Sequence, residues 1–143
     1  MISNSAKYAL IAVLFLGANS SEEHKILAKD LSDNTGVPKA YLSKLMQELT
    51  KKNLISSVRG PKGGFYLTDD EKNQFIIDIV TAIDGEQRIK KCILTLHKCD
   101  ASHPCPLHNL VSDSKDDCLK KFEETKIKDL IEDIILGKSF LSV

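Results

Sequence analysis

Hydrophobic residues near the start of the chain form one unbroken run. Residues 9–16 are all apolar, which predicts a helix that is buried on every side, in the core or in a dimer. The run also resembles the apolar region of a signal peptide, but only Lys7 supplies a positive charge before it. It is too short to span a bilayer, which needs about 20 residues. We therefore expect a core helix and no membrane partner.

Two short helices follow. Apolar residues at helical spacing predict one helix over residues 26–31 and a second over residues 41–49. Between them, Gly36 can adopt the left-handed conformation that closes a helix, and Pro38 suits the first turn of the next one. This arrangement is the sequence outline of a helix-turn-helix.

A glycine-rich hairpin is expected directly after the second helix. β-prone residues at 54–58 and 65–67 flank the tip Arg59-Gly60-Pro61-Lys62-Gly63-Gly64. A basic hairpin in this position is typical of the wing of a winged helix. A further short helix is predicted from Gln74 to Ile83, and Asp84-Gly85 ends it.

A long helix is predicted from Pro106 to about Glu124. Its apolar residues form a narrow stripe on an otherwise charged rod, and they are Leu107, Leu110, Val111, Cys118 and Phe122. Such a stripe usually pairs with another helix, so a homodimer through this helix is expected. Thr125 is expected to cap a last short helix that runs to Ile135.

The expected fold class is therefore mainly α with a small β-hairpin. Residues 1–84 would form a winged helix-turn-helix DNA-binding domain, and residues 85–105 a cysteine-containing sensor loop. Residues 106–143 would form a long C-terminal dimerisation helix and a tail.

The distribution of charge points to DNA. The formal net charge is zero, but residues 38–62 hold six basic side chains against one carboxylate, and residues 100–133 hold five against nine. Neutralising phosphates supplies most non-specific DNA affinity. The expected DNA contacts are Pro38, Lys39, Ala40, Tyr41, Ser43 and Lys44 in the second helix, and Arg59, Gly60, Pro61 and Lys62 in the wing. For Tyr41, core packing is the alternative to a DNA contact. For Lys51 and Lys52, which follow in the basic segment, the alternative to phosphate binding is capping of the negative end of the second helix.

Three cysteines and a histidine lie close together in the sequence. Cys92, Cys99 and Cys105 follow the pattern Cys-x6-Cys-x5-Cys, and His108 comes three residues later. Thiolates with an imidazole suit an iron–sulfur cluster or zinc. Cys105 is expected to be the N-cap of the long helix, which would bring its side chain against that of His108. Cys118 lies on the apolar stripe, where core packing is the expected role.

The wing sequence and the recognition-helix residues Tyr41-Leu42 resemble those of the Rrf2 family of winged helix-turn-helix transcriptional regulators. The resemblance extends from Ser5-Ala6-Lys7-Tyr8-Ala9-Leu10 over nearly the whole chain. It implies a cytoplasmic, nucleoid-associated homodimer that binds double-stranded operator DNA. In IscR-type and NsrR-type members three cysteines in this region hold an iron–sulfur cluster, and a histidine three residues after the third is similar to the IscR-type fourth ligand.

Two departures from the family pattern affect the metal site. The first gap between cysteines has six residues, where the best-known cluster members have five. Some NsrR-type members use an aspartate of the partner's first helix, and Lys7 stands at the corresponding place. We therefore expect His108 as the fourth ligand, with His97 and His103 as alternatives. A 2Fe–2S cluster is favoured, 4Fe–4S is an alternative, and zinc is the second choice of metal.

The expected function is a regulator, with repression favoured, that senses redox state, nitric oxide or iron–sulfur status through the cluster. The same regulator using zinc or free thiols is the main alternative. A metal-storage or electron-transfer protein would leave the basic helix and wing without a purpose. A cysteine enzyme using Cys105 and His108 would lack a third orienting group and an oxyanion element, so no enzymatic activity is expected.

Overall fold

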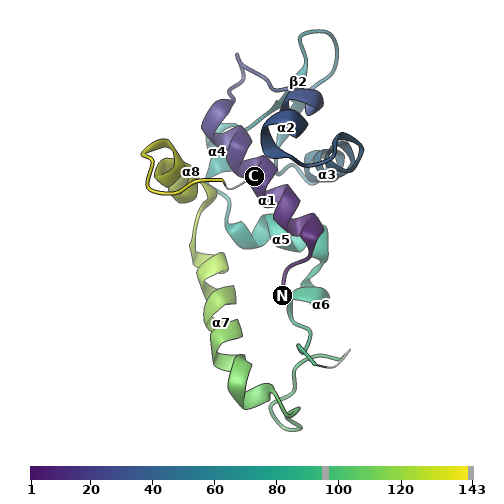
Figure 1. The fold of residues 1–143 in the computed structure, drawn as a ribbon, viewed down its shortest axis with the longest axis vertical. Helices are drawn as coiled ribbons and strands as arrows, with labels where there is room; N and C mark the ends of the chain where they lie inside the picture. The colour runs from purple at the N-terminus through teal and green to yellow at the C-terminus, as the bar shows by residue number, and fades with distance from the viewer. Residues whose placement is uncertain (95–96, 142–143) are drawn as a thin grey trace.

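A computed structural model describes residues 1–94 and 97–141 (Figure 1). The elements in chain order are α1 (Asn4–Asn19), α2 (Ala28–Thr35), α3 (Lys39–Lys51), β1 (Ser56–Val58), β2 (Gly64–Tyr66), α4 (Asp69–Lys72), α5 (Ile76–Asp84), α6 (Glu86–Ile89), α7 (His108–Glu124) and α8 (Ile127–Ile135). The fold is mainly α with one antiparallel hairpin, as the sequence predicts. In the described part of the chain, no helix is both long and apolar enough to cross a membrane.

The apolar run at the start of the chain forms the central helix, α1. Ser3 caps this helix, because its side-chain oxygen accepts a hydrogen bond of 3.0 Å from the Ala6 N–H. The other helices pack around it, with α5, α8, α2 and α3 all in contact (Figure 1). The expectation of a core helix is therefore confirmed, but the helix is not buried on every side, because Leu10, Ile11, Leu14 and Phe15 are half-buried.

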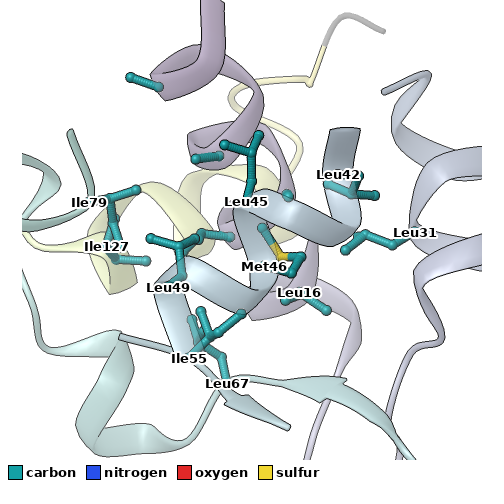
Figure 2. Packing of buried hydrophobic residues seen from close by; sticks show 14 of the residues in the cluster. Leu16, Leu31, Leu42, Leu45, Met46, Leu49, Ile55, Leu67, Ile79 and Ile127 are labelled. Atoms are coloured by element: carbon teal, nitrogen blue, oxygen red, sulfur yellow. The ribbon is translucent and has the colours of Figure 1, made fainter. Parts of the chain in front are cut away.

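The hydrophobic core gathers side chains from distant parts of the sequence. Figure 2 shows Leu16 of α1 and Met46 of α3 in the same cluster as Ile79 of α5 and Ile127 of α8. The apolar face of α3 is buried in this cluster, so its opposite face is free to meet another molecule.

The helix-turn-helix forms as predicted, with one correction. Gly36 closes α2 in the left-handed conformation at φ 70°, and Pro38 is the N-cap of α3. However, α2 begins at Ala28, and Ile26 is not helical. The backbone of Ile26 instead pairs with Phe65 of β2 through two hydrogen bonds of 2.9 and 2.8 Å.

The predicted wing is present as the hairpin of β1 and β2. Val58 stands opposite Gly64 and Ser56 opposite Tyr66. The absence of a side chain at Gly64 allows the segment around Ile26 to approach the hairpin this closely, because a Cβ at Gly64 would lie 2.7 Å from the Ile26 carbonyl oxygen. The wing is therefore tied to the segment that leads into α2.

The predicted helix at 74–83 is present as α5, and Gly85 follows its last residue. Two short helices were not predicted. Thr68 caps α4 by accepting from the Glu71 N–H at 3.2 Å, and α6 occupies the start of the expected sensor loop. Four-residue helices bury too few side chains to give a helical pattern in the sequence.

The boundaries of the C-terminal helices differ from the predictions. α7 begins at His108 with Leu107 as N-cap, so Cys105 is not the cap. The chain makes a separate turn first, in which the His108 N–H donates to the Cys105 carbonyl at 2.9 Å. Thr125 ends α7, and Lys126 is the N-cap of α8. The Thr125 carbonyl accepts from Ile76 N–H at 3.0 Å, which holds its backbone extended between the helices.

α7 extends away from the body that the other long helices form (Figure 1). Its C-terminal half packs on α5, and Leu119 and Phe122 pack against the core. Phe122, a residue of the predicted apolar stripe, therefore finds its partners within the chain. Leu110, near the other end of the helix, is 75% exposed.

Candidate functional site

The start of α3 presents most of the predicted DNA contacts on the surface. Pro38, Lys39, Ala40 and Lys44 are exposed, and Ser43 is half-buried. Tyr41 is 41% exposed. These side chains occupy the helix face that the core leaves uncovered.

Tyr41 also contacts α1, so its two expected roles are not exclusive. Its hydroxyl is hydrogen-bonded to the hydroxyl of Ser5. Its ring stands edge-on to that of Tyr8, with the centroids 5.7 Å apart. The contacts fix the orientation of Tyr41 while part of the ring stays open to solvent.

The wing and α3 line the same groove. This groove, of about 600 Å³, has Gln47, Thr50 and Lys51 of α3 on one side and Ser57 to Gly60 of the wing on the other. All four predicted wing contacts, Arg59, Gly60, Pro61 and Lys62, are exposed. Gly60 has φ 107°, a conformation that favours glycine, and this tightens the tip.

Two lysines at the end of α3 have different surroundings. Lys52 lies 3.4 Å from Glu48 and also donates to the carbonyl of Ala82. Lys52 therefore holds α3 against α5, which supports a structural role for it. Lys51 is exposed and lines the groove beside the wing.

The four predicted metal ligands meet in two pairs. The Sγ atoms of Cys92 and Cys105 are 3.3 Å apart. The Sγ of Cys99 is 3.1 Å from Nδ1 of His108. This pairing differs from the expected contact between Cys105 and His108, because α7 begins two residues later than predicted.

The loop that carries Cys92 and Cys99 is closed by backbone contacts. The Cys92 N–H donates to the His97 carbonyl at 3.0 Å, and Lys91 pairs with Lys98 in an isolated antiparallel bridge. These contacts return the chain toward α7. Within residues 1–94 and 97–141, no group of three or more His, Cys, Asp or Glu side chains is close enough to hold a metal ion.

The other histidines and the fourth cysteine lie outside the two pairs. His103 Nδ1 contacts Asp100 Oδ2 at 3.2 Å, and its side chain is 88% exposed. His97 is exposed. Cys118 is half-buried on α7, a position compatible with its expected packing role.

The surroundings of Cys99 disfavour its thiolate in the metal-free protein. Partial loss of water around the sulfur raises the pKa of the Cys99 thiol, and the neighbouring Cys92 raises it further. The Lys115 ammonium acts in the opposite direction. A metal ion that bound to Cys99 would have to displace the thiol proton.

Two features near these sites were missed in the sequence. Ser3 joins α1 to α5, because its backbone N–H donates to Asp84 at 2.8 Å and its hydroxyl also donates to this carboxylate. Lys115 is 7% exposed, although lysine is a residue type that is almost never fully buried. Its spacing of four from both Val111 and Leu119 was the available signal that it lies on the inner face.

Comparison with known proteins agrees with this architecture. The model of the Rrf2 family, described as iron-dependent transcriptional regulators, matches residues 2–133. The chain has the fold of a winged helix-turn-helix regulator, and it belongs to the Rrf2 family of transcriptional regulators. The resemblance seen in the sequence is confirmed.

Individual relatives support the same conclusion. A protein of Aquifex aeolicus named as an HTH-type transcriptional regulator is 33% identical over 92% of this chain and 91% of its own length. The regulator IscR of Xenorhabdus nematophila is 32% identical over 78% of this chain and 67% of its own length. The structure of CymR, the global cysteine regulator of B. subtilis, covers 92% of this chain and 96% of its own, with 21% identity and a TM-score of 0.72, which shows a common fold.

Proposed function

We propose that this regulator is a homodimeric operator-binding protein that holds an iron–sulfur cluster on Cys92, Cys99, Cys105 and His108. The observation that carries the proposal is the contact within each of two pairs of these side chains, Cys92 with Cys105 at 3.3 Å and Cys99 with His108 at 3.1 Å. Three thiols and an imidazole are a donor set that suits iron–sulfur clusters. The similarity to IscR, over 78% of this chain, supports the same assignment.

The two pairs favour a 2Fe–2S cluster. Each iron of such a cluster takes two protein ligands. Rieske centres illustrate this, because two histidines replace two cysteines on one of their two irons. A structural zinc site instead needs four ligands around one ion. With one pair for each iron, Cys92 and Cys105 would hold one iron, and Cys99 and His108 would hold the other. The cluster would supply one-electron chemistry and sensitivity to oxidants.

The remaining proposed roles follow the division of the chain. Residues 1–84 bind DNA, residues 85–105 sense, and residues 106–143 form the dimer contact and tail. The exposed residues at the start of α3 and in the wing are the proposed contacts with operator DNA, which the protein would meet in the cytoplasm. We call Cys92, Cys99, Cys105 and His108 together the cysteine centre. Changes at the cysteine centre would move the start of α7 and so alter the distance between the two α3 helices of the dimer.

Anaerobic purification with iron and sulfide analysis tests the cluster. We expect two irons and two sulfides per chain and a visible absorption spectrum for a 2Fe–2S centre. Alanine at position 92, 99 or 105 should remove the spectrum, and Cys118→Ala, the matched control, should keep it. Protein that contains no iron, or one zinc per chain, would overturn the proposal.

A regulator that uses its thiols directly is the second candidate. It is favoured by the 3.3 Å contact between Cys92 and Cys105, which places two oxidisable sulfurs together without any metal. Metal-free protein whose operator affinity responds to a thiol oxidant, with no response to cluster loading, would support this candidate.

A further inference from the structure

α7 buries one charged side chain. Lys115 is the buried residue of this helix within the described chain, at 7% exposed. The other lysines of α7, Lys120 and Lys121, have side chains that are 70% exposed and lie near carboxylates one turn away. Lys115 therefore requires an explanation different from that of a solvated surface lysine.

The contacts of Lys115 do not neutralise its charge. Its ammonium donates to the backbone carbonyl of Lys91, the residue before Cys92. No carboxylate of residues 1–94 and 97–141 forms an ion pair with it. A buried ammonium is costly unless an anion compensates it, and one neutral carbonyl does not supply that anion.

Lys115 borders a hollow beside a member of each pair of predicted ligands. It lines a hollow of about 390 Å³ together with Cys92, Ile89 and Ile93. It also lines a second hollow, of about 490 Å³, together with Cys99 and His108. Among the described residues, Lys115 alone lines both hollows, so its side chain is close to Cys92 on one side and to Cys99 and His108 on the other.

We propose that Lys115 is a positioning residue of the cysteine centre and the counter-ion of its bound cluster. Its hydrogen bond to the Lys91 carbonyl holds the start of the cysteine loop against α7. Its charge offsets the thiolates of the three cysteines when they bind the cluster. The counter-ion role rests on the proposed function, whereas the hydrogen bond concerns the protein with or without metal.

The charge has a direct consequence for the cluster. Three thiolates and a neutral imidazole leave the cluster with a net negative charge, which increases when the cluster takes up one electron. A nearby ammonium stabilises the reduced form more than the oxidised form. Asp113 and Asp116, which line the second hollow, act in the opposite direction. Removing the ammonium should therefore make reduction harder.

Potentiometry of four anaerobically purified variants tests the counter-ion role. At a fixed potential, Lys115→Gln and Lys115→Met should each lower the ratio of reduced to oxidised cluster about tenfold, which is about 59 mV for a one-electron couple. Lys115→Arg should restore the wild-type ratio. Lys120→Gln, which removes the same charge from the exposed face of α7, should leave the ratio unchanged.

The outcomes separate charge from packing. A wild-type ratio in Lys115→Gln with a lowered ratio in Lys115→Met alone would overturn the counter-ion role, because Gln retains a donor but not the charge. If Lys115→Gln takes up no cluster, Lys115→Arg distinguishes the explanations. A wild-type cluster content in Lys115→Arg would support the counter-ion role, and the absence of cluster from Lys115→Arg would overturn it.

Hydrogen exchange in the metal-free protein separately tests the clamp, by which we mean the hydrogen bond from Lys115 to the Lys91 carbonyl. Lys115→Met should speed exchange at the Cys92 amide, which is bonded to the His97 carbonyl, and Lys120→Met should not. Unchanged exchange would overturn the clamp. If the wild-type protein holds no cluster, the proposed function and the counter-ion role fail together, and the exchange result still decides the clamp.

Discussion

The Sγ of Cys99 and the Nδ1 of His108 are 3.1 Å apart, and these residues belong to two different parts of the chain. Cys99 lies in the loop that follows α6, and His108 is the first residue of α7. The contact therefore joins the loop to the end of the helix proposed to form the dimer. In the proposed mechanism, a change of chemistry at this contact would act directly on the start of that helix.

His108→Cys should keep the cluster and lower its reduction potential. Histidine ligation raises the potential of such centres relative to all-cysteine ligation, so an additional thiolate should favour the oxidised form. Potentiometry by visible absorption measures the shift. His103→Cys is the matched control, because His103 contacts Asp100 and lies outside the pairs. An unchanged reduction potential in His108→Cys would show that His108 is not a ligand of the cluster.

The metal-free protein should form a disulfide between Cys92 and Cys105 when treated with diamide. Their sulfurs are already 3.3 Å apart, so a small movement allows a bond of about 2.05 Å. Oxidation removes two electrons and two protons from the thiols, and diamide takes up both. Peptide mapping after blocking of the free thiols identifies the pair. A dominant link that includes Cys99 or Cys118 would contradict the arrangement, and Cys105→Ala should abolish the expected one.

Lys44→Ala and Arg59→Ala should each weaken operator binding and reduce its salt dependence. Each lost phosphate contact lowers the slope of log affinity against log salt by about 0.9. Both residues are exposed, so the melting temperature should not change. Fluorescence anisotropy with a selected operator at several salt concentrations gives the slope. Lys120→Ala, on the acidic half of the chain, is the control and should bind like the wild type. Equal salt slopes in all three variants would show that the DNA binds to another face of the protein.

The sequence predicts the helix-turn-helix and the wing well because their signals are local. Gly36, Pro38 and the glycines of the wing mark turns whatever the rest of the chain does. Ile26 was assigned wrongly because its pairing with Phe65 is a long-range contact, which apolar spacing does not report. Lys115 was missed for a different reason, because its residue type suggests solvent although its spacing places it on the inner face of the helix.

The cysteine centre could be predicted as a set of residues but not as an arrangement. Residue types and spacing indicate Cys92, Cys99, Cys105 and His108 together. Which side chains meet depends on the turn in which the His108 N–H bonds to the Cys105 carbonyl, and on the closure of the loop at Cys92 and His97. Neither contact has a periodic signal, because both lie in irregular segments.

Leu110→Asp should convert the proposed dimer to monomers. Leu110 is 75% exposed in the single chain, and burying it once in each protomer would contribute about 3 kcal/mol to a symmetric dimer, or about a hundredfold in affinity. Sedimentation velocity over a range of concentrations measures the change. Ile135→Asp, at a residue 65% exposed on α8, in the tail beyond the proposed dimer helix, is the matched control and should stay dimeric. A dimeric Leu110→Asp protein would place the contact on another surface.

The packing of α8 on α1 depends on the absence of a side chain at Gly17. A Cβ at this position would overlap the Cδ1 of Ile131, which is buried on α8. Gly17→Ala should gain about 1 kcal/mol of helix propensity but lose about 2 kcal/mol through overpacking, a net destabilisation of about 1 kcal/mol. Ile131→Val removes the overlapping methyl group, so the double variant should be more stable than the sum of the single changes predicts. Urea denaturation of the four proteins, all metal-free, measures this coupling. Strictly additive effects would show that α1 and α8 do not meet at this pair, since only a direct contact makes the smaller side chain at 131 relieve the larger one at 17.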